Sequence, residues 1–188
     1  MSKAEIIRKI KENVSKNKET DRIMWFSMWF FLSVASFGLA LFPMFYFLIE
    51  RRNKHFFRQK ELENLLLRLK GMEKIDSDKE YITKRNSILW ALSIILIFPV
   101  IIIAYILTKE LILHEEEQRR FFAVFLPDND FPTRKINLKF YLVLTLATLG
   151  IGAIYWFYKI FNYYNDHFIK QWVIEDKIVK LLESEFNE

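Results

Sequence analysis

The chain has 188 residues, of which 52% are hydrophobic, 17% aromatic and 27% charged, and the apolar and charged residues are segregated along it. This segregation excludes an ordinary globular mixture and indicates apolar helices joined by charged segments. The net charge of +5 comes from basic residues at the ends of apolar runs rather than from a nucleic-acid-binding motif, and the absence of cysteine excludes disulfides and thiolate metal sites.

Residues 1–22 are expected to form an amphipathic N-terminal helix. Ile6, Ile7, Ile10 and Val14 recur at helical spacing among Lys and Glu residues. A helix with this pattern lies at a lipid surface or packs on a partner.

Three apolar runs of at least 20 residues follow, namely Ile23–Ile49, Ile88–Leu107 and Leu138–Phe161. Because a helix rises about 1.5 Å per residue, each run is long enough to cross a hydrocarbon core about 30 Å thick. The expected fold is an all-α integral membrane protein with three hydrophobic helical segments. The expected localisation is the cell membrane, as a multi-pass protein with the lipid bilayer as partner.

Each run contains helix-breaking residues near its middle, and they leave a second reading open. The breakers are Gly38 with Pro43, Pro99, and Gly150 with Gly152. A kinked single span is favoured, since Gly and Pro are common in membrane helices. The alternative is a re-entrant hairpin with both ends on one face. Basic residues nearly balance between the two sides of three crossings, which leaves the orientation open and is also what hairpins would give.

Charged amphipathic helices are expected to extend the first and third runs. Apolar residues recur at helical spacing over residues 54–70 and again over 172–186. The chain is therefore divided into an N-terminal helix (1–22), a first span with its charged helix (23–70), a linker with the middle span and a loop (71–137), and a last span with its charged helix (138–188).

Residues 30–69 and 142–181 indicate an internal duplication. Without gaps they match at 11 of 40 positions, and the matches include polar residues that shared apolarity cannot explain. Those pairs are Asn53/Asn165, His55/His167, Gln59/Gln171 and Glu63/Glu175. The middle run joins only faintly, because Tyr105, His114 and Gln118 repeat the spacing of Tyr, His and Gln in both copies. A true triple repeat would favour hairpins and would place all three His on one side.

The segment LATLGIGAIYWFYKIFNYYNDHF resembles a widespread prokaryotic membrane domain of unknown function. That family has Thr-Leu-Gly-Ile-Tyr, then Tyr-Trp and a basic residue at the end of a span. The matching residues here are Thr148, Leu149, Gly150, Ile151, Tyr155, Trp156 and Lys159, whereas Gly152 stands where the family has Tyr. The resemblance implies an integral membrane protein and no activity.

The repeated polar residues form two stripes, because His55, Gln59 and Glu63 are spaced four apart along a helix, as are their counterparts. We expect a hydrogen-bonded seam between the copies or between subunits, made of Asn53, His55, Gln59, Glu63, Asn165, His167, Gln171 and Glu175. A second reading is a lipid-headgroup site, with Arg51, Arg52, Lys54 and Lys159 as the basic residues.

A metal or proton site is a third, less favoured reading, and no bound metal or cofactor is expected. One stripe cannot supply such a site, since His55 and Glu63 lie about 12 Å apart along a helix. Both copies would have to converge, with His55 and His167 joined by an acid such as Glu63 or Glu175. The run His114–Gln118 lacks a second His at the fourth position after the first, and we interpret it as a charged span end.

No motif of an enzyme is present, so none is expected. The favoured function is an oligomeric membrane-anchored scaffold or assembly subunit that presents its charged helices to a protein partner, to another copy or to lipid headgroups. The alternatives are a small ion channel or transporter lined by Ser33, Ser36, Thr145 and Thr148, and a membrane-shaping hairpin protein.

Overall fold

A computed structural model describes residues 2–72, 83–126 and 135–184. All regular elements in these ranges are helices, which confirms the all-α class. They are α1 (Lys3–Ser15), α2 (Asn17–Thr20), α3 (Phe26–Ala35), α4 (Leu41–Leu69), α5 (Ser87–Ser93), the 3₁₀ helix η2 (Ile94–Leu96), α6 (Phe98–Phe125), α7 (Leu138–Ala147) and α8 (Ile151–Ser184). Parts of the expected linker, residues 73–82 and 127–134, lie outside the described ranges.

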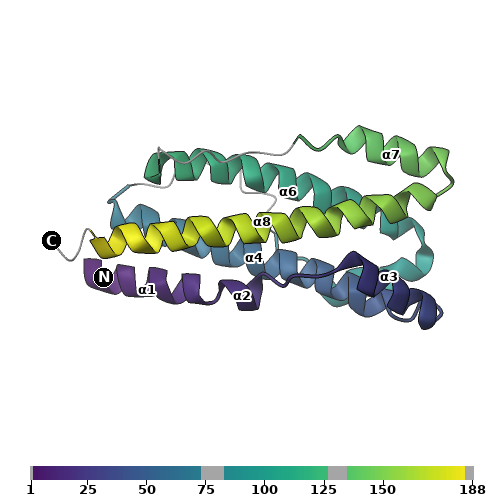
Figure 1. Ribbon diagram of the computed structural model, residues 1–188, viewed down its shortest axis with the longest axis horizontal. Helices are drawn as coiled ribbons and strands as arrows, with labels where there is room; N and C mark the ends of the chain where they lie inside the picture. Colours follow the sequence, from purple (N-terminus) through teal and green to yellow (C-terminus); the bar gives the residue numbers. More distant parts are fainter. Residues whose placement is uncertain (1, 73–82, 127–134, 185–188) are drawn as a thin grey trace.

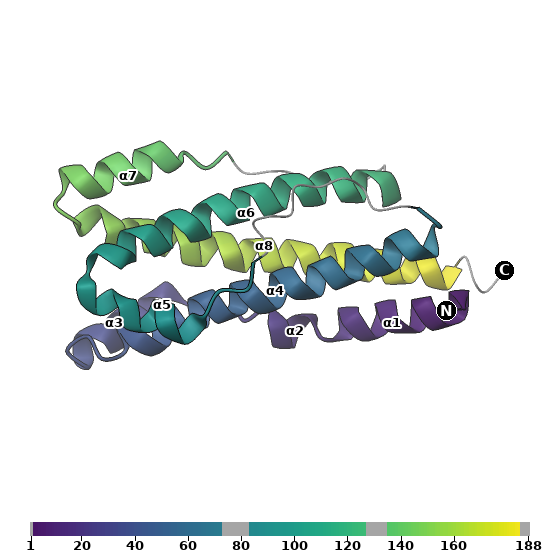
Figure 2. The ribbon, with the colours of Figure 1, turned by 180° about the vertical axis from the view of Figure 1, so that it is seen from behind.

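Three helical hairpins make up the body of the protein. In each, a short helix (α3, α5 or α7) turns back into a long one (α4, α6 or α8). The three turns lie at one end of the molecule, and the long helices run from there in the same direction (Figures 1 and 2). Both chain termini lie at the opposite end, where α1 runs beside α4 and α8.

The first and third hairpins turn in the same way. Phe37 and Leu149 both have φ of 51°, and the glycines that follow, Gly38 and Gly150, have φ of 90° and 100°. Each glycine N–H donates to a carbonyl five residues back, over 2.7 Å and 2.8 Å. The breakers in the middle of these runs therefore reverse the chain, because the positive φ values end the helix.

The second hairpin reverses by another route. Helix α5 tightens into η2, and Ile97 then takes φ of 61° before α6 begins. Pro99 occupies the first turn of α6, where its missing N–H costs no helical hydrogen bond. This different turn explains why the middle run shows no gapless match to the other two.

The prediction of a multi-pass protein in the cell membrane is wrong. Among the described residues, no helix is both long enough and apolar enough to cross a membrane. The physical reason is the chain reversal within each apolar run, which divides the expected span between a short helix and the beginning of a long one. The described chain has the hairpin geometry that the sequence left as the alternative.

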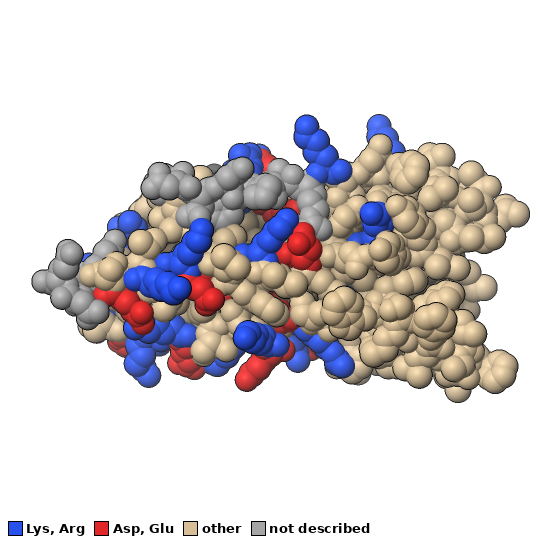
Figure 3. Space-filling model, in the orientation of Figure 1, with Lys and Arg blue, Asp and Glu red and all other residues tan. Residues whose placement is uncertain are grey.

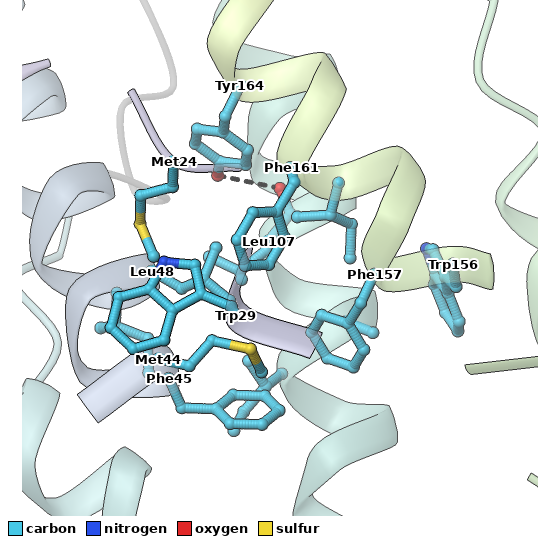
Figure 4. Close-up of a cluster of buried hydrophobic side chains, with 14 of the residues drawn as sticks. Met24, Trp29, Met44, Phe45, Leu48, Leu107, Trp156, Phe157, Phe161 and Tyr164 are labelled. Atoms are coloured by element: carbon cyan, nitrogen blue, oxygen red, sulfur yellow. Dashed lines mark hydrogen bonds between the residues drawn. The ribbon is translucent and has the colours of Figure 1, made fainter. Parts of the chain in front are cut away.

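Two apolar clusters hold the helices together. The larger lies toward the turns and includes Trp29, Phe45, Leu107 and Trp156. Figure 4 shows this cluster, in which the Tyr164 hydroxyl donates to the Leu107 carbonyl over 3.1 Å. The smaller cluster lies at the other end, where apolar residues of α1, α4, α6 and α8 meet.

The expected amphipathic helices are present. Helix α1 buries the four predicted residues Ile6, Ile7, Ile10 and Val14. The far half of α4 buries Leu62, Leu65 and Leu66, and the far half of α8 buries Ile178 and Leu182. These apolar stripes all face the smaller cluster, so they pack on one another within the chain.

Gly152 allows α7 and α8 to approach closely. A Cβ atom there would lie 2.8 Å from backbone atoms of Leu144 and Thr145. We expect Gly152→Ala to lower the free energy of unfolding by about 1–3 kcal/mol, because the backbone must move apart. The exposed neighbour provides the control: Ile151→Ala should change the thermal unfolding followed by circular dichroism much less. Equal losses in both variants would contradict the close approach.

Candidate metal centre

A layer of buried polar side chains lies between the two apolar clusters. Its centre is formed by His55, His114 and His167, which are 0%, 2% and 5% exposed. One comes from each long helix. They are the only His residues of the chain, so the fold collects all three at one point.

The imidazole Nε2 atoms of the three His face one another. The Nε2 atom of His55 lies 3.0 Å from that of His167 and 3.2 Å from that of His114. The ligand atoms of all three lie within 4.8 Å of one another. Two ligands around a tetrahedral zinc ion with bonds of about 2.0–2.1 Å lie about 3.3 Å apart. The two distances from His55 Nε2 are therefore close to the separation of two ligands on one metal ion.

Carboxylates hold the outer nitrogen of two of these rings. His55 Nδ1 lies 2.9 Å from Asp21 Oδ1, and His167 Nδ1 lies 3.3 Å from Glu115 Oε1. An ionised carboxylate only accepts hydrogen bonds, so His55 Nδ1 carries the proton of its ring and His55 Nε2 keeps its lone pair. Such carboxylate–histidine pairs orient metal-binding imidazoles in proteins.

Burial keeps His55 neutral at physiological pH. Desolvation lowers the pKa of its imidazole to about 4, although the neighbouring Asp21 acts to raise it. Burial alone would raise the pKa of the Asp21 carboxyl, but His55, Arg58 and the Thr20 hydroxyl hold it well below its usual range. The pair is thus an ionised acid beside an uncharged ring, which leaves the lone pair of His55 Nε2 available for a cation.

Arg58 joins the carboxylates around the site. Its Nη2 atom lies 2.7 Å from Asp21 Oδ2, and its Nη1 atom lies 2.8 Å from Glu175 Oε1. All three side chains are almost fully buried. Burial raises the pKa of Glu175, against the opposing effect of Arg58. Arg58 therefore compensates part of the negative charge of Asp21 and Glu175.

A layer of three glutamines lies one helical turn beyond the histidines. The side-chain amides of Gln118 and Gln171 donate to the side-chain oxygen of Gln59, Oε1, over 3.2 Å and 3.0 Å. Gln59 in turn donates to Glu175. Each glutamine follows a histidine by four residues, so the same His-x-x-x-Gln unit comes from each of the three helices.

The eight residues of the expected seam are all buried, and several of them meet. Contacts between the copies join His55 to His167 and Gln59 to Gln171. The acids Glu63 and Glu175, expected as possible metal ligands, do not belong to the group of converging ligand atoms. The third ligand candidate is His114, so residues 114–118, which we interpreted as a charged span end, also contribute a buried side chain to the cluster. The repeated Tyr, His and Gln spacing was the signal for it.

Arg51 and Arg52 do not face lipid headgroups, because both are buried. Arg51 donates to Asn165 Oδ1 over 2.9 Å, and Arg52 pairs with Glu110 over 2.9 Å. Burial lowers the pKa of both guanidinium groups. Of the four basic residues predicted for headgroups, Lys54 is exposed and Lys159 is half-buried.

The fold and the site define an all-helical protein with a buried three-histidine centre. Comparison with known proteins adds no relative: no family model, no curated protein and no solved structure matches the chain.

Replacement of Arg58 tests the charge balance of the layer. Arg58→Met leaves Asp21 and Glu175 buried without their cation, and we expect a loss of about 3–5 kcal/mol in the free energy of unfolding measured with denaturant. Arg120, which pairs with Glu116 at the surface, is the control. Arg120→Met should cost no more than about 1 kcal/mol. A loss in Arg58→Met as small as that in Arg120→Met would show that the buried network does not depend on Arg58.

The His55 pKa predicts a dependence of stability on pH in the metal-free chain. Unfolded His55 takes up a proton near pH 6.5, whereas the folded ring takes one up only near pH 4. The unfolded state therefore binds more protons between these values, so the free energy of unfolding should fall as the pH falls from about 6.5 to about 4. Denaturant titrations across this range would measure it. In His55→Gln this slope should be shallower, and an unchanged slope would assign it to other groups.

Proposed function

We propose that the protein binds a transition-metal ion at His55, His114 and His167, and that the ion joins the three hairpins. The observation that carries this proposal is the convergence of three buried imidazole nitrogens, one from each long helix: the Nε2 atoms of His167 and His114 lie 3.0 Å and 3.2 Å from His55 Nε2.

Hydrogen bonding supports a cation at the centre. Because a neutral imidazole has a single N–H, and His55 directs its own to Asp21, its Nε2 faces the Nε2 atoms of His114 and His167 as a bare lone pair. In the tautomer that directs the His167 N–H toward Glu115, two lone pairs lie 3.0 Å apart and repel each other unless a cation lies between them. A metal ion bound by both removes the repulsion, and His114 completes a set of three ligands.

Zinc is the first candidate among the metals. Imidazole suits Zn, Cu, Fe and Ni, whereas Mg and Ca prefer oxygen ligands. Three histidines fill three of the four positions of a tetrahedral zinc ion and leave one to a further ligand. The carboxylates of Asp21 and Glu115 compensate part of the charge of a divalent ion.

The repeat gives this site its symmetry. We infer that the first and third hairpins descend from one duplicated unit, since their turns share the same φ values and hydrogen bonds as well as the His and Gln positions. The middle hairpin supplies its His-x-x-x-Gln unit at the same level, which supports a third copy with an altered turn. Each copy would contribute one ligand to the metal.

In this proposal the metal stabilises a scaffold. An ion tying α4, α6 and α8 together fixes their relative height and adds its binding energy to folding. The scaffold and channel functions stay predictions. For the channel, the Ser36 and Thr148 hydroxyls accept hydrogen bonds from backbone N–H groups within their own turns, which favours a structural role for both.

Metal titration tests the proposal directly. The tag-free chain, stripped with a chelator, should bind one Zn²⁺ per chain by elemental analysis and calorimetry, and should give the strong visible absorption of tetrahedral Co²⁺ when cobalt replaces zinc. His55→Ala, His114→Ala and His167→Ala should each abolish the stoichiometric binding, because they are the only His of the chain.

Two neighbouring acids give a matched comparison. Glu115→Gln removes the carboxylate that orients His167 and should weaken zinc binding about 10–100-fold. Glu116, one residue away, pairs with the surface residues Arg119 and Arg120, so Glu116→Gln should leave the affinity unchanged. Circular dichroism shows whether each variant is folded. The proposal fails if folded His variants bind zinc like the parent chain, or if the parent chain binds none.

A further inference from the structure

Among the described residues, the end of the molecule that carries the three turns has no charged side chain. Residues 23–49, 86–108 and 140–158 contain no Asp, Glu, Lys or Arg. These segments form the hairpin turns and the helix portions beside them. On the face shown in Figure 3, this end shows neither acidic nor basic residues, whereas the opposite end is covered with both.

Large apolar side chains are exposed at this end. The residues at the turns are the most exposed: Phe37 at 99%, Leu149 at 96% and Ile97 at 78%. Further exposed apolar residues come from the short helices and from α8, among them Phe31, Leu89, Val143, Leu146 and Ile154. The short helices therefore present apolar side chains both to the cluster inside and to the surroundings outside. Exposed apolar residues on ordinary protein surfaces are scattered singly, whereas here they are gathered at one end of the molecule.

We propose that this end is embedded in one leaflet of a lipid bilayer, with the three turns toward the bilayer midplane and the charged half outside. No helix crosses the membrane in this arrangement. Both termini stay on the side of the charged half, because they lie at the opposite end from the turns.

The length of the hairpins fits a single leaflet. Leu149 lies ten residues from Lys139 on α7 and ten from Lys159 on α8, which is about 15 Å along a helix. Half of a hydrocarbon core of about 30 Å is also about 15 Å. Ile97 lies twelve residues from Lys109, or about 18 Å. On the second and third hairpins the first charges thus appear at about the depth where a leaflet ends.

The side chains at this boundary are those that suit lipid headgroups. Lys109 Nζ lies 5.9 Å from the Tyr105 ring, and Lys159 Nζ lies 5.7 Å from the Tyr155 ring. Aromatic residues and lysines collect at membrane interfaces, where the ring meets the acyl chains and the ammonium group meets phosphate. A second protein would bury one face of this end, whereas the apolar side chains protrude from all three hairpins.

The backbone of the turns is suited to hydrocarbon. In lipid, backbone N–H and C=O groups have to be satisfied within the protein. The N–H groups of Gly38 and Gly150 donate to carbonyls five residues back. The Ser36 and Thr148 hydroxyls accept hydrogen bonds from the N–H groups of Ala40 and Gly152. These four backbone N–H groups are thus paired locally, although the side chains around them are exposed and apolar.

This placement puts the histidine centre just outside the hydrocarbon. His55 and His167 each follow the first residue of their turn, Phe37 or Leu149, by eighteen residues, and His114 follows Ile97 by seventeen. These spacings correspond to about 26–27 Å of helix, against about 15 Å for the leaflet. The charged half would then lie among and above the headgroups.

Depth measurements on vesicles test the proposal. The chain has no Cys, so single Cys residues at Phe37, Ile97 and Leu149 can carry a fluorescent label in the full-length protein. In vesicles of phosphatidylcholine and phosphatidylglycerol, quenchers attached deep in the acyl chain should quench these labels more than quenchers near the headgroup. A label at Lys109 should show the reverse order. A label at Ser184 should be quenched only by an aqueous quencher.

Flotation with the same vesicles provides the second measurement. Phe37→Asp combined with Leu149→Asp should reduce the bound fraction at least about tenfold, because aspartate is costly in hydrocarbon. Phe57→Asp, at an exposed phenylalanine on the charged half of α4, should leave flotation unchanged. Zinc affinity should be the same in both variants, which separates this test from the metal centre.

Three results would overturn the proposal. The first is quenching of the turn labels by the aqueous quencher alone in the presence of vesicles. Cross-links between turn labels of two copies, with no quenching by lipid, would show that a second copy covers this end. Equal flotation of the parent chain and the Phe37→Asp, Leu149→Asp variant, both folded by circular dichroism, would show that the turns do not enter lipid.

Discussion

The structure depends on the pairing of buried charges between two apolar clusters. Asp21, Arg58 and Glu175 are almost fully withdrawn from solvent, and each would be strongly unfavourable there without its partners. The partners come from the segment after α2, from α4 and from α8, so the charges are satisfied only when these parts stand at one relative height. Apolar side chains tolerate sliding, but this network does not. The polar layer therefore sets the register of the bundle, and the apolar clusters supply most of the burial.

Turn geometry and site geometry are linked through distance along the chain. Each long helix begins at a turn, and each histidine follows its turn by seventeen or eighteen residues. Three parallel helices that begin at one level must then bring their histidines to one level as well. The glutamines follow four residues later and form the next layer. A change in the length of one hairpin would lift one imidazole out of the centre, so the turns and the histidines constrain each other.

The sequence predicted the helical class, the amphipathic helices and the repeated His and Gln positions, because these follow from periodicity and self-similarity. Whether an apolar run crosses a membrane or turns back was not predictable from hydropathy. Gly38 and Gly150 suit a kinked span as well as a turn, and only the positive φ at Phe37 and Leu149 distinguishes the two. The match of His114 to the other two histidines is faint in the sequence because its hairpin turns differently. Asp21 gave no signal, because one acid in a charged leader is indistinguishable from a surface residue until the fold buries it.

The buried polar layer and the apolar end have complementary roles in holding the helices together. If lipid surrounds the apolar end, acyl chains solvate the outer faces of its helices. The hydrophobic effect then contributes little to holding these helices together. Interactions that are specific to the contact between helices then have to fix the arrangement. Here these are the histidine and glutamine layers and the ion pairs, which lie just beyond the charge-free end. In the proposed arrangement, a metal ion on the three imidazoles would strengthen the contact between the helices at the level where lipid gives way to water, and it would hold the three hairpins at a common depth.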